Sequence, residues 1–257
     1  MNTDTVNFDI NAEQYSKWEV TSNDSYLNKF YEFADIEKND KVIDIACGSG
    51  DFLIACSGRI GKSKGIDISK KLIEIARISS KNKHVNNLSF EAKNIEQGEN
   101  TKDESYDAIV CRMAMHHFEH TDLAFEKSLA YAAQECKVAM QDIVSHDVEI
   151  VDKYFEKLEK YIDQTHKCII SKDDFEYLFR KNDIDIEKTV VLEREIILDK
   201  YIQHAKQSPE QIQKLNKHIM EGMSNSIIRQ YIYKKDNITV FKRKILLIKG
   251  RLRRNGV

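Results

Sequence analysis

The sequence predicts an α/β protein with a parallel sheet covered by helices on both faces. Short apolar runs alternate with helix-like segments from residue 41 to residue 144. The first run ends in the glycine-rich turn Cys47-Gly48-Ser49-Gly50, and the second ends in an acid, Asp67, directly before a helix start. This alternation is typical of parallel sheets, because each crossover helix returns the chain to the same edge.

The elements of the first half follow from apolar periodicity. Apolar residues that alternate or run together predict five strands, over residues 41–46, 65–68, 88–92, 106–111 and 137–144. Helical spacing or helix start signals predict three intervening helices, over residues 51–57, 69–78 and 123–133.

The pattern changes in the second half of the chain. Residues 147–182 are helix-like and rich in lysine, glutamate and aromatic side chains, and residues 190–198 predict a strand. Ser208 precedes Pro209 and stands three positions before Gln211, which is typical of a capped helix start. The apolar runs within residues 238–248 predict the final strand.

Composition excludes several classes of protein. The 257 residues suit a single domain, and a net charge of -2 gives no sign of a nucleic-acid or membrane partner. Five cysteines without a Cys-x-x-Cys pair predict buried free thiols in a reducing compartment. No apolar stretch approaches 18 residues and the N-terminus resembles no signal peptide, so we expect a cytoplasmic protein without membrane insertion.

The last sixteen residues are the exception to this charge balance, because they are strongly basic. We expect a solvated strand face and tail here rather than a binding patch. The basic residues are Lys242, Arg243, Lys244, Lys249, Arg251, Arg253 and Arg254.

The glycine turn predicts a nucleotide-type site. Its spacing, Asp44-x-x-x-Gly48-x-Gly50, is neither the dinucleotide fingerprint nor a P-loop, which needs a lysine after the glycines. Glycines let the backbone approach a ligand, and the helix that follows offers unpaired N–H groups. Asp44 repels phosphate but suits an amine, which favours S-adenosylmethionine, a ligand with an ammonium, a sulfonium and no phosphate.

Two further strand ends carry candidate ligands. Asp67 suits the 2′- and 3′-hydroxyls of a ribose, because the carboxyl ends of parallel strands face the ligand crevice. The Asn94 amide oxygen suits an adenine amino group and the Ile95 N–H suits the adenine ring. Taken alone, an asparagine after a strand is more often a turn residue.

Four segments in this order resemble the class I S-adenosylmethionine-dependent methyltransferases, most closely the subgroup that includes the ubiquinone and menaquinone C-methyltransferases. The opening Phe8-Asp-Ile-Asn-Ala-Glu-Gln-Tyr15 is similar to that subgroup's Phe-Asp-x-x-Ala-x-x-Tyr. The four segments are Val42-Ile-Asp-Ile-Ala-Cys-Gly-Ser-Gly50, Gly65-Ile-Asp-Ile-Ser69, Phe90-Glu-Ala-Lys-Asn-Ile-Glu96 and Tyr106-Asp-Ala-Ile-Val-Cys-Arg-Met-Ala-Met-His-His-Phe118.

The resemblance implies a Rossmann-like, seven-stranded, mostly parallel sheet whose last strand runs antiparallel between strands five and six. It implies one methyltransferase domain over residues 1–257 with four segments: an N-terminal helical lid (1–35), a cofactor-binding core (36–145), a helical cap insertion (146–184) and a C-terminal completion of the sheet (185–257). Two departures from the family are the missing Lys-Pro-Gly-Gly turn, here within Ala132–Lys137, and the family's Arg-Asp-Pro-Ser-His, here Ile162-Asp-Gln-Thr-His166.

The resemblance also implies which residues hold S-adenosylmethionine and release S-adenosylhomocysteine. Ala46, Cys47 and Gly48 line the methionine part, Cys111 and Arg112 take its amino end, and Tyr15 closes over its carboxylate. The full predicted cofactor set is Tyr15, Asp44, Ala46, Cys47, Gly48, Gly50, Asp67, Ile68, Asn94, Ile95, Cys111, Arg112 and His117.

Histidines are the candidate bases for the reaction, since imidazole titrates near neutrality. The candidates are His116, His117, His120 and His166. We expect His117 beside the cofactor and His116 or His166 beside the substrate. A metal site on the three neighbouring histidines is not predicted, because adjacent side chains point in different directions and no cysteine pair completes the set.

The acceptor predicted from the sequence is a small molecule. The Asn-Pro-Pro-Tyr signature of amino-group methyltransferases that act on nucleic acid bases is absent. Two alternatives stay open. One is a catalytically degenerate methyltransferase fold that serves as a binding or regulatory partner, and the other is an RNA methyltransferase that uses the basic C-terminus.

Overall fold

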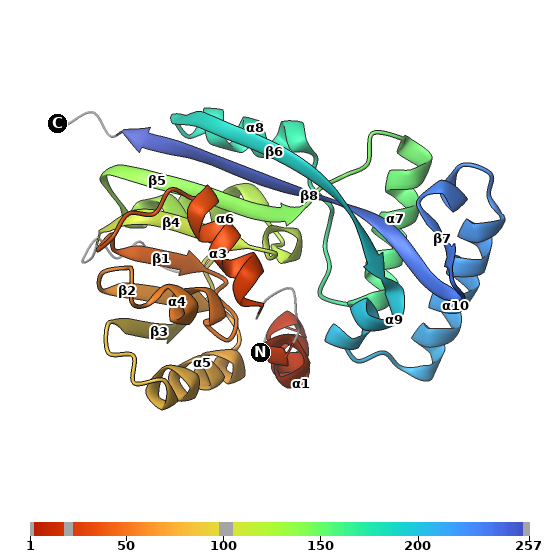
Figure 1. The fold of residues 1–257 in the computed structure, drawn as a ribbon, viewed down its shortest axis with the longest axis horizontal. Coiled ribbons are helices and arrows are strands. Elements are labelled where there is room, and N and C mark those ends of the chain that lie inside the picture. Colours follow the sequence, from red (N-terminus) through yellow and green to blue (C-terminus); the bar gives the residue numbers. More distant parts are fainter. Residues whose placement is uncertain (1–2, 18–22, 98–104, 254–257) are drawn as a thin grey trace.

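The computed structural model describes residues 3–17, 23–97 and 105–253, and Figure 1 shows their fold. The order of the sheet is β3-β2-β1-β4-β5-β8-β6, and a further strand, β7, pairs with β8. The strands are β1 (Val42–Ile45), β2 (Ser63–Asp67), β3 (Leu88–Ala92), β4 (Tyr106–Arg112), β5 (Ala132–Ile143), β6 (Ile184–Ile197), β7 (Ile232–Lys235) and β8 (Ile238–Arg253).

The predicted Rossmann-like α/β architecture is confirmed. Strands β1 to β5 pair in parallel, and β8 runs antiparallel to both β5 and β6, between which it lies. The additional strand β7 was not predicted. It forms a hairpin with β8 through Asp236 and Asn237, whose φ angles of 50° and 64° match the tight turn that suits twisted strands.

Helices cover both faces of the sheet (Figure 1). The α-helices are α1 (Thr3–Lys17), α3 (Asp24–Phe33), α4 (Asp51–Cys56), α5 (Lys70–Asn82), α6 (Thr121–Ser128), α7 (Glu149–Ile162), α8 (Lys172–Lys181), α9 (Leu198–Tyr201) and α10 (Pro209–Ser224). Short 3-10 helices are η1 (Met115–His117), η2 (Leu129–Tyr131), η3 (Ile202–His204) and η4 (Ile228–Gln230).

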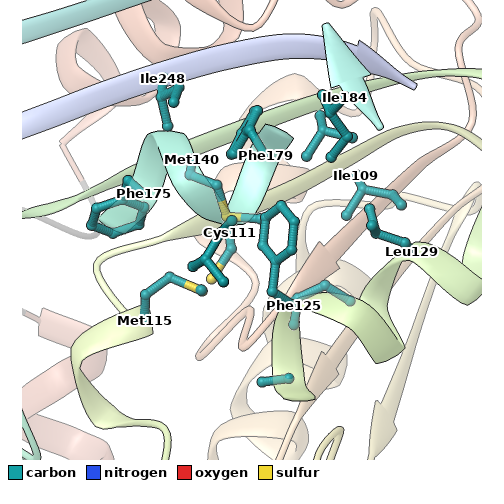
Figure 2. Packing of buried hydrophobic residues seen from close by; sticks show 14 of the residues in the cluster. Ile109, Cys111, Met115, Phe125, Leu129, Met140, Phe175, Phe179, Ile184 and Ile248 are labelled. Atoms are coloured by element: carbon teal, nitrogen blue, oxygen red, sulfur yellow. The ribbon is translucent and has the colours of Figure 1, made fainter. Parts of the chain in front are cut away.

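The two faces of the sheet have separate hydrophobic cores. On one face, α3, α4 and α5 pack on the strands through residues such as Phe30, Leu53 and Ile73. On the other, α6 and α8 meet over β4 and β5, where the rings of Phe125 and Phe179 lie 5.4 Å apart (Figure 2). Both faces are therefore buried, which explains the nearly continuous apolar runs of these strands.

Several predicted boundaries moved. The helix predicted over 123–133 ends earlier, and β5 begins at Ala132 rather than at residue 137. Likewise β6 begins at Ile184 rather than at residue 190, and β8 continues to Arg253. The added residues of β5 from Glu135 on and most of those of β6 pair with β8, which supplies hydrogen-bond partners that local periodicity does not reveal.

Beyond the end of β5, β6 and β8 continue as a pair into a third hydrophobic cluster with α7, α9 and α10 (Figure 1). Residues of the predicted helical cap therefore divide between two places, because α7 belongs to this cluster whereas α8 packs on the sheet through Phe175 and Phe179. No residue of α7 or α8 lines the cavity described below. The division of the chain into four segments remains a prediction.

Helix α1 lies between strands β1 to β3 and this third cluster and is attached on both sides (Figure 1). The Asp9 carboxylate accepts hydrogen bonds from Ser69 Oγ and from the Lys71 backbone N–H, at 2.5 and 3.2 Å, where α5 begins. On the other side, Asn11 Oδ1 accepts a hydrogen bond of 3.0 Å from the Lys206 N–H. These contacts hold α1 across the carboxyl ends of the strands.

The five cysteines are free, and Cys56, Cys111 and Cys136 are buried as expected. Cys168 differs, because it is exposed in the connection between α7 and α8. Within the described ranges, no helix is both long and apolar enough to cross a membrane.

Candidate functional site

A cavity opens at the carboxyl ends of β1, β2, β3 and β4. It encloses about 1100 Å³, part of it open to solvent. The strand order reverses between β1 and β4, and such a reversal is where ligands bind in open α/β sheets. Eleven of the thirteen predicted cofactor residues line it: Tyr15, Asp44, Ala46, Cys47, Gly48, Asp67, Ile68, Asn94, Ile95, Arg112 and His117.

The other two predicted residues lie behind the wall. Gly50 has a φ of +76°, and a Cβ there would lie 2.6 Å from the Phe90 ring, so this glycine shapes the start of α4 without touching the cavity. Cys111 is fully buried in the core that α6 and α8 share. Side chains alternate along a strand, so its neighbour Arg112 faces the cavity instead.

The backbone bends unusually at two lining residues. Ala46 after β1 and Met113 after β4 have φ angles of 56° and 51°, in the left-handed region that favours glycine. Each residue comes directly after its strand, and its left-handed conformation ends the strand and turns the chain along the cavity. Backbone strain of this kind collects at functional sites.

Asp67, at the end of β2, is nearly buried and joins two loops. Its Oδ2 accepts a hydrogen bond from the Gly48 N–H at 2.8 Å, and its Oδ1 accepts one from the Ser69 N–H at 2.8 Å. Burial raises the pKa of Asp67 to about 6, although these two N–H groups favour the carboxylate. The remaining oxygen lone pairs are available to ligand hydroxyls.

Asp44, at the end of β1, is the most deeply buried acid of the cavity wall, with 2% of its surface exposed. Burial raises its pKa to about 7, against the opposing charge of Arg112. Arg112 donates to Gln141 Oε1 at 3.1 Å, and its guanidinium lies over the Phe30 ring at 5.4 Å. Asp44 is therefore poised to become ionised when a cation enters the cavity.

Asn94 lines the cavity, and its side chain also builds the turn after β3. Its Oδ1 accepts a hydrogen bond of 2.9 Å from the Glu96 N–H. This is the local turn role that an isolated asparagine commonly has. Contact with an adenine remains a prediction for Asn94 and for Ile95, whose side chain is buried in the core.

The two histidines expected beside the substrate do not line the cavity. His116 is buried, and its Nδ1 hydrogen-bonds Asp142 Oδ1. His166 is also buried, with its Nε2 3.3 Å from Glu156 Oε2. The geometry does not favour either as a base, since each ring is held by a carboxylate behind the wall. No group of three His, Cys, Asp or Glu in the described residues has a metal-binding arrangement.

His117 is the histidine that reaches the cavity. Its Nδ1 lies 3.0 Å from Thr165 Oγ1, which is itself 2.7 Å from Asp163 Oδ1. Asp163 Oδ2 also accepts a hydrogen bond from the Tyr15 hydroxyl of α1. Burial would raise the pKa of Asp163, but hydrogen bonds from His204 and Tyr15 outweigh burial and hold it well below its usual range.

Sequence reasoning missed half of the cavity lining. Phe8 lies within the N-terminal motif, and Met113, Ala114 and Phe118 lie in the segment after β4. Their position beside predicted site residues was the only signal in the sequence that could have identified them. The lining residues that were not predicted are Phe8, Ser49, Asp51, Phe52, Ile66, Leu72, Lys93, Glu96, Met113, Ala114 and Phe118.

An α/β sheet with one inserted antiparallel strand, a glycine turn after β1 and acids ending β1 and β2 define the class I methyltransferase architecture. The sequence model of the family described as "Methyltransferase domain" matches residues 36–183. This range is more than half of the chain, which therefore belongs to the methyltransferase-domain family.

Known proteins agree with this class. The uncharacterised methyltransferase YcgJ of Bacillus subtilis is 26% identical over 189 residues, which cover 72% of this chain and 74% of that protein. Its crystal structure has the same fold, with a TM-score of 0.80 at 23% identity over 90% of this chain and 98% of that chain.

Two other relatives are similar over less sequence or at lower identity. Demethylmenaquinone methyltransferase of Bacillus licheniformis is 32% identical over 78 residues, 29% of this chain and 30% of that protein. Coclaurine N-methyltransferase, solved with N-methylheliamine and S-adenosylhomocysteine, has a TM-score of 0.59 at 15% identity and covers 87% of this chain and 71% of that chain. The latter likeness concerns the fold alone.

Proposed function

We propose that this protein transfers the methyl group of S-adenosylmethionine to a small-molecule acceptor. The observation that carries the proposal is the pair of buried acids, Asp44 and Asp67, which end neighbouring strands and line one cavity with the glycine turn. A phosphate-bearing nucleotide would be repelled there, whereas a ligand with an ammonium, a sulfonium and a ribose is attracted.

The chain's own residues fit this cofactor. A Cβ added at Gly48 would meet no atom within 4 Å, so the backbone is open to a ligand at this point of the wall. The lone pairs that Asp67 does not use in backbone hydrogen bonds suit the two ribose hydroxyls. Asp44 lies one strand away, where a carboxylate would stabilise the positive methionine end.

When bound, the cofactor supplies a methyl group that is already activated by its sulfonium. The protein has to align donor and acceptor and keep water out. Helix α1 contributes Phe8 and Tyr15 to the cavity wall, and its contacts with Ser69 and Asp163 hold it in place. The partial cover that α1 gives the cavity favours a small acceptor.

The basic C-terminal strand does not favour RNA as the acceptor. Acids lie within ion-pairing distance of most of its cationic residues. The pairs are Lys242 with Glu193, Arg243 with Glu159, Lys244 with Asp147, Lys249 with Asp35 and Glu187, and Arg251 with Glu187. The expectation of a solvated strand face is wrong for Arg243, which is buried. Arg254 lies outside the described residues. We therefore propose a small molecule, of which a quinone-type acceptor is one case.

Isothermal titration calorimetry with S-adenosylmethionine and S-adenosylhomocysteine tests the proposal. We expect both compounds to bind, and we expect Asp67→Asn to weaken binding at least tenfold. In this variant the amide NH₂, a donor, would face the N–H group of Gly48 or Ser69, which is also a donor, and one hydrogen bond to the ribose would be lost. Asp185→Asn, which removes an exposed carboxylate on β6, is the matched control and should bind as the parent does. If neither compound binds the parent protein, the degenerate-fold alternative replaces this proposal.

A further inference from the structure

We propose that His117 is a catalytic base that takes the proton of an acceptor hydroxyl group through its Nε2 atom, in a tautomer set by Thr165 and Asp163. The inference rests on the proposed function and deepens it, because it assigns the base and the chemical class of the acceptor. It also replaces His116 and His166 in the role expected for them from the sequence.

The hydrogen bonds around Asp163 determine which group donates in the contacts that join Asp163, Thr165 and His117. Asp163 is 3% exposed and ionised, so it can only accept hydrogen bonds. The backbone N–H and the hydroxyl of Thr165 both lie close to its Oδ1, at 2.8 and 2.7 Å. The single hydroxyl proton of Thr165 is therefore directed to Asp163.

The tautomer of His117 follows from this. Thr165 Oγ1 has no proton left for the imidazole, so at 3.0 Å it must accept a hydrogen bond from Nδ1–H of His117. In the neutral ring, Nε2 then carries the lone pair. None of the described residues hydrogen-bonds Nε2, and the imidazole lines the cavity.

The protonation state of the ring agrees with this role. Burial, with a smaller contribution from His116, lowers the pKa of His117 to about 3, so the imidazole is neutral at physiological pH. The carboxylate of Asp163 acts in the opposite direction and favours the protonated ring. It is thus positioned to stabilise the imidazolium once a proton arrives.

The charge balance of methyl transfer suits such a base. An oxygen lone pair of the acceptor forms the new O–C bond, the S–C bond breaks with its electrons remaining on sulfur, and the hydroxyl proton moves to Nε2. The positive charge lost by sulfur reappears on the imidazole, so the net charge of the cavity does not change.

An unprotonated Nε2 that faces the cavity also favours one acceptor class, because the ordinary pKa of an imidazole, about 6.5, lies well below that of an ammonium group. A methylated hydroxyl is a strong acid that gives up its proton readily, even to this ring. A methylated amine keeps its proton, because ammonium groups have pKa values of about 10. A hydroxyl group, as in an alcohol or phenol, therefore fits His117 better than an amine does.

The tautomer is tested by NMR of the full-length protein with ¹⁵N-labelled histidine, assigned with His117→Gln. We expect His117 to show a protonated Nδ1 and an unprotonated Nε2. Thr165→Val should abolish this preference and Thr165→Ser should retain it, while both variants bind S-adenosylhomocysteine within about twofold of the parent. A protonated Nε2 in the parent, or an unchanged tautomer in Thr165→Val, overturns the inference.

The acceptor class is tested in the same spectra with S-adenosylhomocysteine present. Phenol, which has a hydroxyl proton, should shift the Nε2 resonance, and anisole, which lacks one, should not. An equal response to both, or no response to phenol, rejects the hydroxyl class.

The catalytic role is tested with phenol and S-adenosylmethionine. A general base contributes about 10²–10⁴-fold to a rate, so His117→Gln should lower the formation of S-adenosylhomocysteine at least 100-fold when S-adenosylmethionine is saturating for each protein. An unchanged rate rejects His117 as the base. Failure of the parent to bind S-adenosylhomocysteine is a different result, because it rejects the proposed function itself.

Discussion

At the residue scale, the cavity wall contains two acidic side chains that are largely shielded from water. Asp44 and Asp67 are almost fully buried, and burial raises their pKa values to about 7 and about 6. The positive charge of Arg112 opposes this shift at Asp44 but does not outweigh burial. A cationic ligand strongly changes the ionised fraction of an acid whose pKa is close to 7.

This predicts a pH dependence for cofactor binding. A cation lowers the pKa of a neighbouring acid, so S-adenosylmethionine should release protons on binding, and its affinity should rise between pH 5.5 and 7. Each released proton contributes at most about tenfold per pH unit. Calorimetry in buffers of different ionisation enthalpy measures both quantities.

The control for this dependence is Asp44→Asn, which removes the group with the higher pKa. The variant should bind more weakly at pH 7 and show a flatter pH profile, with Asp67 as the remaining contributor. A parent protein whose affinity is constant between pH 5.5 and 7 would contradict the assignment of Asp44 to the cationic end of the ligand.

At the element scale, local signals placed helix and strand starts well. Ser208 caps α10 and forms with Gln211 the reciprocal capping box that their spacing predicted. Ser69 likewise caps α5 through the Leu72 N–H. The strands were less well bounded, because β5 and β6 extend along β8, which is far away in sequence.

Helix α1 is the element whose attachment matters most for the site. The Tyr15 hydroxyl donates to buried Asp163, and the Tyr15 ring lies 5.8 Å from that of Phe8. We predict that Tyr15→Phe increases amide hydrogen exchange across residues 5–17 and speeds dissociation of S-adenosylhomocysteine severalfold. Loss of a hydrogen bond to a charged group costs about 1.5–3 kcal/mol, here concentrated in the docking of α1.

Tyr177→Phe provides the comparison, because Tyr177 lies on α8 with 61% of its surface exposed. This variant also removes a tyrosine hydroxyl but leaves α1 unchanged, so amide exchange in α1 and dissociation of S-adenosylhomocysteine should match the parent. Equal exchange in the parent and in Tyr15→Phe would show that α1 does not depend on this hydrogen bond.

At the scale of the whole molecule, β8 joins the parallel part of the sheet to the third hydrophobic cluster. Where β8 extends past the end of β5, Arg243 forms a buried ion pair with Glu159 of α7, and Tyr201 donates to Glu159 Oε2 at 2.9 Å. The aromatic rings of Phe155 and Phe241 lie 5.5 Å from the guanidinium carbon. This pair connects α7 to the strand that both parts share.

We predict that Glu159→Leu lowers the free energy of unfolding by about 3–5 kcal/mol, because it leaves the Arg243 charge buried without a partner. The double variant with Arg243→Met should cost much less than the single one, since neither charge remains. Urea unfolding of both variants gives the comparison. Additive losses in the double variant would mean that the two charges contribute independently.

Much of the fold followed from patterns within a few residues. The alternation of strands and helices, the glycine turn and the acids near the ends of β1 and β2 all depend on local geometry, and a parallel sheet brings such strand ends together whatever the rest of the chain does. For this reason eleven of the thirteen predicted cofactor residues lie around one cavity. Cys111 was predicted to contact the cofactor, but its side chain lies in the hydrophobic core. The alternation of side chains along β4 decides which face each one points to, whatever the family motif implies.

The sequence by itself thus determined the class of protein and eleven of the residues that line the cavity, since both depend on spacing along the chain. Only the tertiary structure decided which histidine reaches that cavity. His116 and His117 are adjacent, yet one meets Asp142 of β5 and the other meets Thr165, 48 residues further on. Contacts between distant segments choose the direction of each ring and its tautomer, and no local pattern carries that information.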